Sequence, residues 1–122
     1  MRTEEIAGTV VLHVPAQGAS ISSSQDALDL IGEAWSVSAT VIAVPAGRFD
    51  PAFFDLRTRL AGEFLQKLVN YRLSLAVVGD VSGHVAASDA LRDFVHESNR
   101  GGHVWFLDDD DALVGRVTGR RR

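Results

Sequence analysis

Buried-strand patterns alternate with helical patterns along most of this chain. The segments Thr40–Pro45 (TVIAVP) and Leu73–Asp80 (LSLAVVGD) are nearly unbroken apolar runs, typical of strands covered on both faces. His103–Leu107 (HVWFL) has the same character. Near the N-terminus, RTEEI, Ala7-Gly8 and TVVLHVP predict either a short hairpin or one long first strand, because apolar and polar positions alternate in the second half.

Helical patterns fill the intervals between these strands. Ser23 is an N-cap with Asp26 three residues later, an acidic variant of the capping box. Asp50-Pro51 begins a short helical turn before the second helix. Ser88 caps a third helix, which Gly101 ends. The positions expected to face the sheet from these helices and from a last one are Ala27, Ile31, Ala34, Trp35, Leu56, Leu60, Phe64, Leu68, Leu91, Phe94, Val95, Leu113 and Val117.

This order of elements predicts an α/β fold. We expect a mostly parallel sheet of four to five strands with right-handed crossovers, an N-terminal hairpin at its edge and about four helices. Thr40–Val44 and Leu73–Val78 should lie side by side and point the same way. Residues 1–114 form one domain in this interpretation, and residues 115–122 (GRVTGRRR) form a basic, flexible C-terminal tail.

Composition narrows the possible partners. The net charge is -4, although the last eight residues carry four arginines and no acid, so the rest of the chain is more acidic and should repel nucleic acid. There is no cysteine, which excludes disulfides and thiolate chemistry. The acidic start lacks the apolar run of a signal peptide, and the apolar runs are too short to span a bilayer. We therefore expect a cytoplasmic protein with no membrane contact.

Sequence signatures of cofactor and metal chemistry are missing. The chain has no phosphate-binding P-loop, no G-x-G-x-x-G after a strand and no G-x-S-x-G elbow. The four histidines are scattered, and His13 and His103 lie in predicted strands as core or edge residues. The acids Asp108–Asp111 complement the dipole of the last helix and lack the pattern of a calcium loop. We expect no cofactor and no metal.

One group of polar residues suggests a cleft. Ligands of parallel sheets gather at the carboxyl ends of the strands. The loops at those ends carry Arg48, Asp55, Asp80, Ser82, His84 and Asp108. A small enzyme or small-ligand binder that uses Asp55, Asp80 and His84 is therefore one hypothesis. Polar loops contain such residues in any case, so a non-enzymatic protein is favoured.

The stretch FFDLRTRLAGEFLQK concentrates charge at the start of the second long helix. Asp55, Arg57, Thr58 and Arg59 lie in or before its first turn. Glu63 can pair with Arg59 and with Lys67 along one exposed stripe, since these residues are four apart. Tyr71, at the end of the helix, is expected to pack with its hydroxyl pointing outward, although an exposed tyrosine beside an arginine would also suit an interface.

Several long segments carry a family resemblance. DALDLIGEA, FDPAFFDLRTRLAGEFLQKLVNYRLSLAVVGD and ALRDFVHESNRG resemble the small bacterial proteins grouped as domain-of-unknown-function family four-one-eight-zero, over roughly Ile21 to Val114. The family has no assigned reaction, so this resemblance implies no activity.

The order of elements is also similar to that of STAS domains, the anti-sigma-factor antagonists. That similarity implies a non-enzymatic regulatory module, which binds a kinase-like or sigma-related protein partner or self-associates. STAS domains are switched by phosphorylation of a hydroxyl in a motif that reads roughly Asp-Ser-Ser-Gly. Asp55 matches its acid, Leu56 and Arg57 replace its hydroxyls, and Thr58 is the nearby substitute. The alternative is that Thr58 or Asp55 only caps the helix.

Overall fold

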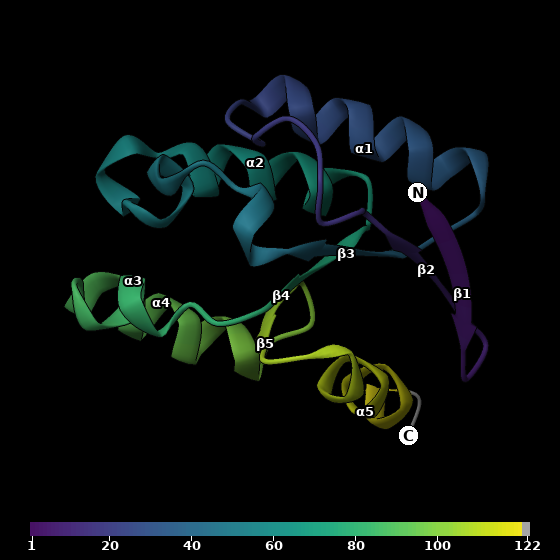
Figure 1. Ribbon diagram of the computed structural model, residues 1–122. Helices are drawn as coiled ribbons and strands as arrows, with labels where there is room; N and C mark the ends of the chain where they lie inside the picture. The colour runs from purple at the N-terminus through teal and green to yellow at the C-terminus, as the bar shows by residue number, and fades with distance from the viewer. Residues whose placement is uncertain (121–122) are drawn as a thin grey trace.

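The sheet has five strands in sequential order, and the computed structural model describes the backbone of residues 1–120 and the side chains of residues 1–119 (Figure 1). The first two strands are antiparallel, and all later neighbours are parallel. The strands are β1 (Arg2–Ile6), β2 (Thr9–His13), β3 (Val41–Pro45), β4 (Ser74–Val78) and β5 (Val104–Leu107). The α/β class, the mostly parallel sheet and its antiparallel edge are confirmed.

The N-terminal alternative is decided in favour of a hairpin. Ile6 pairs with Thr9, so β1 and β2 are joined by the two residues Ala7 and Gly8. Both residues have positive φ, 51° for Ala7 and 83° for Gly8. Two left-handed residues are what a type I′ turn requires, and this turn matches the twist of the strands it connects.

β3 and β4 form the parallel pair that the apolar runs predict. Ile42 lies opposite Leu75, and Val44 lies opposite Val77. All four side chains are buried, because helices cover this part of the sheet. The pairing confirms that the two segments lie side by side and point the same way.

Five α-helices and three short 3-10 helices connect the strands. The α-helices are α1 (Ser24–Ser36), α2 (Leu60–Asn70), α3 (Ser82–Ala86), α4 (Asp89–Arg100) and α5 (Asp110–Arg120). The 3-10 helices are η1 (Ala46–Arg48), η2 (Pro51–Phe54) and η3 (Leu56–Thr58). Helix α3 occupies a segment expected to be a loop; it begins where the Asp80 carboxylate accepts the backbone N–H of Ser82.

The helices divide the core into two layers. Leu12, Leu75 and the inward residues of α1, α2 and α4 share one apolar cluster. Val11 and Ala76, which neighbour them along the strands, point to the opposite face and pack with α5. This division follows from the period of two along each strand. In Figure 1, α1 and α2 lie together on one side of the sheet, and α5 lies on the other.

Trp35 is not part of the core, contrary to the helical pattern. The buried residues of α1 are Ala27, Leu30, Ile31 and Ala34, and the Trp35 side chain is 62% exposed. One residue corresponds to about 100° of rotation around a helix, which moves Trp35 from the inward stripe to its solvent side. There it meets Tyr71 in an edge-to-face contact with ring centroids 5.6 Å apart. The two form an exposed aromatic pair.

The predicted C-terminal tail is instead largely helical. Helix α5 runs to Arg120, so the expected boundary at residue 114 falls inside it, and residues 121–122 lie outside the described residues. Val117 is fully buried against the sheet. Arg116 donates a 2.8 Å hydrogen bond to the Gly101 carbonyl and lies 5.2 Å from the centre of the Trp105 ring. Leu113 and Val117 lie four residues apart on one face of the helix and anchor it to the sheet. The arginines of this segment had suggested a flexible tail instead.

Candidate functional site

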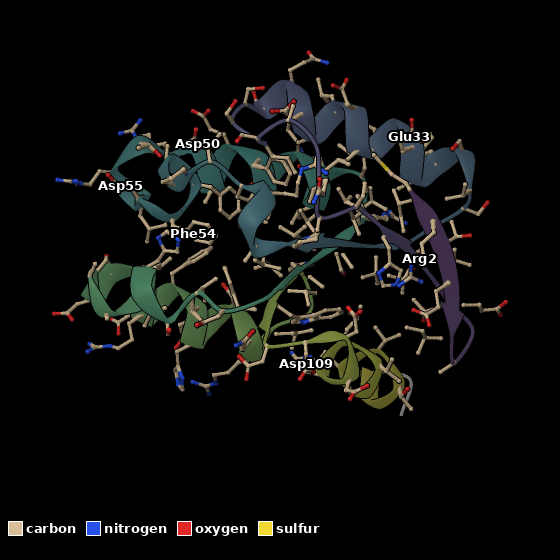
Figure 2. All side chains as sticks on the ribbon, in the orientation of Figure 1. Arg2, Glu33, Asp50, Phe54, Asp55 and Asp109 are labelled. Carbon is tan, nitrogen blue, oxygen red and sulfur yellow. The ribbon has the colours of Figure 1, made fainter. Side chains whose placement is uncertain are left out.

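Asp80 and His84 take separate structural positions. The carboxylate of Asp80 accepts the Ser82 N–H at 2.8 Å. Hydrogen bonds from Ser82, the side chain first and the backbone second, lower the pKa of Asp80. The His84 ring stacks on Phe54 with centroids 4.2 Å apart and planes at 15°. Figure 2 shows Phe54 pointing from η2 toward α3. No hydrogen bond or ion pair joins Asp80 to His84 within the described residues.

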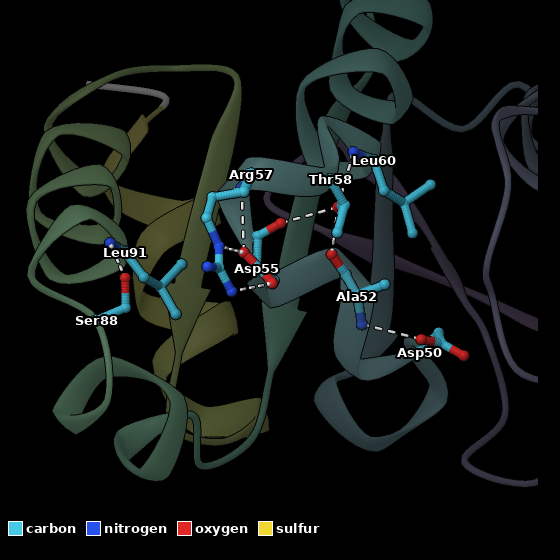
Figure 3. Close-up of polar contacts among 8 residues, drawn as sticks. All are labelled: Asp50, Ala52, Asp55, Arg57, Thr58, Leu60, Ser88 and Leu91. Carbon is cyan, nitrogen blue, oxygen red and sulfur yellow. Dashed lines mark hydrogen bonds and ion pairs between the residues drawn. The ribbon is translucent and has the colours of Figure 1, made fainter.

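Asp55 is paired with Arg57 at the surface. Its carboxylate accepts the backbone N–H of Arg57 at 3.2 Å and the guanidinium Nε and Nη2 at 3.0 Å each (Figure 3). The side-chain hydrogen bond from Arg57 is the main cause that lowers the pKa of Asp55, and the same bond raises the pKa of Arg57. The carboxylate of Asp55 and the guanidinium of Arg57 are therefore hydrogen-bonded to each other at the start of η3.

Thr58 is not the N-cap of α2: the N-cap is Arg59, without a side-chain capping bond, and Asp55 caps η3 instead. The Thr58 hydroxyl lies 2.7 Å from the Ala52 carbonyl and 2.8 Å from the Asp55 carbonyl, to which it donates. Its oxygen also accepts the N–H of Leu60 at 3.2 Å (Figure 3). Arg59 follows with φ 64°, a left-handed conformation that turns the chain from η3 into α2. The loop is thus tied internally before the helix begins.

The remaining residues of the predicted cleft mainly order loops. The Arg48 guanidinium donates to the carbonyls of Pro15, Gln17 and Ala19, at distances from 2.6 to 3.2 Å. This arginine fastens the segment between β2 and α1 to η1. Ser82 contributes to the turn that starts α3. The carboxyl-end loops are therefore built from residues that bind one another.

A shallow groove lies between α2 and α4. Its volume is about 490 Å³, and it is lined by Leu56, Arg59, Gly62, Glu63 and Phe94. Leu56 and Phe94 also pack against the core, so their exposed edges form an apolar floor. Neither of the expected pairs between Glu63 and its neighbours Arg59 and Lys67 is present among the ion pairs of the described residues. The two groove charges are consequently available to a partner.

Tyr71 does not join the other predicted interaction residues. It follows the last turn of α2, whereas Arg59 precedes the first turn of that helix. Its side chain is 44% exposed and contacts Trp35. The predicted interface residues thus fall into two places, the α2–α4 groove and the Trp35–Tyr71 pair.

A larger hollow lies on the opposite face of the sheet. Its volume is about 500 Å³, and it is lined by Met1, Arg2, His13, Val14, Pro15, Ala16, Ala43, Pro45, Val78 and Asp110. Sequence reasoning treated His13 as a core or edge histidine and did not select Arg2 or Asp110. Alternation along β2 places His13 on the same face of the sheet as Val11. The sequence does not show which part of that face α5 leaves uncovered.

Two classes of site are not found in the described part of the chain. Residues 1–120 contain no group of three or more histidine or carboxylate side chains placed to hold a metal ion. No helix within these residues has the length and apolar character needed to cross a bilayer.

The described residues form an α/β domain with helices on both faces of a mostly parallel sheet. Residues 6–117 match the family described as Domain of unknown function (DUF4180), and the chain belongs to this family. The match confirms the family resemblance and extends it from Ile6, at the end of β1, to Val117. No curated protein and no solved structure matches the chain.

Proposed function

We propose that this protein is a non-enzymatic, STAS-like interaction module that binds a protein partner through the α2–α4 groove. The observation that carries the proposal is the composition of the groove. Its floor is the apolar pair Leu56 and Phe94, and its rim holds the charges of Arg59 and Glu63. An apolar centre with a polar rim is the usual anatomy of a protein interface.

The approach to the groove is already ordered, which favours binding. Thr58 ties its hydroxyl to two carbonyls of the preceding turn, and Asp55 holds Arg57 in a bidentate pair. A surface that is ordered before binding loses less conformational entropy when a partner arrives. The ordered turn that precedes α2 therefore supports a docking role.

The free charges indicate what the partner presents. Within the described residues, the Arg59 side chain makes no ion pair or hydrogen bond, whereas Arg57 is paired with Asp55. A partner that inserts a bulky apolar side chain over Leu56 and places a carboxylate near Arg59 fits this surface. The STAS resemblance supports a kinase-like or sigma-related regulator as that partner, with Thr58 as the residue through which binding is regulated.

Gly62 provides a specific test of the groove. A Cβ atom added at this helical position meets nothing within 4 Å. Gly62→Arg should therefore fill the groove without strain inside the protein. Gly32→Arg is the matched control, since Gly32 is an exposed glycine of α1 with equally open surroundings.

The experiment is co-purification from the native host with the wild-type chain and both variants, quantified by mass spectrometry. We expect one partner to be retained by the wild type and Gly32→Arg and reduced at least about tenfold by Gly62→Arg, a loss of about 1.4 kcal/mol. Arg59→Glu should weaken the same partner. Equal recovery with all variants, once their folding is confirmed by circular dichroism, would overturn the proposal.

Self-association is a distinct outcome of this experiment. Analytical ultracentrifugation of the purified chain and of Gly62→Arg separates it from binding of another protein. A wild-type dimer that Gly62→Arg dissociates would assign the groove to a second copy of this chain.

A further inference from the structure

The cavity on the α5 face of the sheet has a small apolar floor. Ala43 and Pro45 belong to β3, and Val78 lies opposite Pro45 at the end of β4. Ala43 also lies opposite His13 of β2. The hollow therefore opens at the carboxyl ends of three adjacent strands, which is where parallel sheets bind ligands. Its volume of about 500 Å³ is within the range of small-molecule sites.

One wall of this cavity is basic. Arg2 and His13 are directly opposite in the antiparallel β1–β2 pair, so both side chains project from the same face. The His13 residue is only 9% exposed, and its Nε2 lies 2.9 Å from the Glu4 carboxylate. Its other ring nitrogen, Nδ1, has no hydrogen-bond partner within the described residues. Glu4 thereby orients the imidazole without occupying both of its nitrogens.

The Arg2 guanidinium is held loosely. Its Nη1 is 4.0 Å from Glu4, beyond hydrogen-bond distance, and its side chain is 62% exposed. Figure 2 shows Arg2 reaching from β1 toward the space between the sheet and α5. Most of its donors are therefore available, and the planar guanidinium matches a carboxylate in bidentate geometry.

An acidic residue of the lining limits the charge of the ligand. Asp110, in the first turn of α5, also lines the cavity. A second negative charge on a ligand would approach this carboxylate and be repelled by it. Nucleotides and dicarboxylates are disfavoured for this reason, and a single carboxylate at the Arg2 side is not.

We infer that this cavity binds a small monocarboxylate with an apolar body. The carboxylate pairs with Arg2, and the apolar body covers Ala43, Pro45 and Val78 beside the His13 ring. This site is independent of the α2–α4 groove, which lies on the other face of the sheet.

Phenylacetate is a suitable probe, with phenylacetamide as its uncharged counterpart of nearly equal shape. Binding is followed by ¹H–¹⁵N NMR titration of the full chain, with the purification tag at the C-terminus because Met1 lines the cavity. For a ligand of this size we expect a Kd on the order of 1–10 mM for phenylacetate. The largest shifts should occur at Ala43, His13 and Val78, and phenylacetamide should bind about tenfold more weakly.

Variants separate the proposed contact from general charge effects. Arg2→Gln should weaken phenylacetate about tenfold and leave phenylacetamide unchanged, because only the carboxylate loses its charged partner. Arg72→Gln removes the same charge at an exposed residue outside both the cavity and the groove, and should leave both affinities unchanged. Neither Arg2 nor Arg72 lies in the groove, so a failure here is distinguishable from a failure of the proposed docking function.

Three results would overturn the inference. The first is the absence of shifts at Ala43 and Val78 at several times the expected Kd. The second is equal affinity for phenylacetate and phenylacetamide. The third is tighter binding of phenylethylamine that Asp110→Asn abolishes, which would assign the cavity to a cation.

Discussion

The hydroxyl of Thr58 donates a 2.7 Å hydrogen bond to the carbonyl of Ala52, across the turn that connects η2 to α2. The same hydroxyl also reaches the Asp55 carbonyl and accepts the N–H of Leu60. In a phosphate ester the Thr58 oxygen has no proton to donate, so phosphorylation would break its bonds to both carbonyls. We therefore expect phosphorylation of Thr58 to release this turn.

Replacing the hydroxyl tests how much the turn depends on it. Thr58→Val should lower the free energy of unfolding by about 1–2 kcal/mol, because the donated and the accepted hydrogen bonds of the hydroxyl are lost while shape is kept. Thr58→Ser should retain most of the stability, and Thr58→Glu should resemble Thr58→Val. Urea denaturation followed by circular dichroism measures all three. A fully stable Thr58→Val would show that the network does not hold the turn.

Two glycines should respond to alanine in opposite directions. Gly62→Ala should raise the free energy of unfolding by about 0.5–1 kcal/mol, since the site is helical and a Cβ meets nothing within 4 Å. Gly79→Ala should lower it by about 1–3 kcal/mol, because its φ is 135° and its Cβ would lie 3.3 Å from that of Ala46. Thermal unfolding under one set of conditions compares the pair. Equal shifts of the same sign would contradict the argument.

The two tryptophans should differ strongly in fluorescence. Trp35 is 62% exposed, whereas Trp105 is buried. Iodide should quench Trp35 efficiently and Trp105 weakly, which is measured on Trp105→Phe and Trp35→Phe, each with one tryptophan left. Trp35→Phe should change stability by less than about 0.5 kcal/mol, as expected for a surface site. Protection of Trp35 from iodide would instead show that something covers the aromatic pair.

Acidic pH should act on two surface carboxylates through their hydrogen bonds. The pKa values of Asp55 and Asp80 are lowered in the folded chain. Their stabilising contribution is therefore complete above the unfolded pKa of about 3.9 and is lost as pH falls through the folded pKa. Carboxyl ¹³C NMR titration should give midpoints below that value for both. Arg57→Gln should raise the pKa of Asp55 and leave that of Asp80 unchanged; an unchanged Asp55 would contradict the assigned cause.

The C-terminal helix should contribute measurably to stability. Val117→Ala removes buried methyl groups from the α5 face of the sheet and should cost about 2 kcal/mol. Val114→Ala, on the exposed side of the same helix, should stay within about 0.5 kcal/mol of the wild type. Urea denaturation measures both. A neutral Val117→Ala would support the original expectation of a detached tail.

Sequence patterns predicted the structure correctly where the pattern and the structure belong to the same helix or strand. The capping box of Ser23 and Asp26 is present because both bonds form within a single helical turn. The apolar runs at Thr40–Pro45 and Leu73–Asp80 identified β3 and β4, since burial on both faces excludes polar residues. Trp35 was wrongly placed in the core because helical spacing does not show where the buried face of α1 ends. The α5 segment was taken for a tail because its arginines outweighed the buried Val117.

The cleft and cavity residues illustrate the limit of sequence reasoning. Asp55 and His84 attracted attention as reactive side chain types, yet one pairs with Arg57 and the other stacks on Phe54. Arg2, His13 and Asp110 gave no comparable signal, because they come from three elements and no spacing relates them. Only the pairing of β1 with β2 and the packing of α5 bring them to one hollow.

Apart from α3, the order and type of the main elements were predictable from the residues, as were the parallel pairing of the central strands and the family. They depend on short-range periodicity and on long characteristic segments. The position of the groove and the cavity was decided by tertiary packing. Periodicity assigns each side chain to a face, but the surfaces left uncovered depend on where helices from distant parts of the chain come to rest.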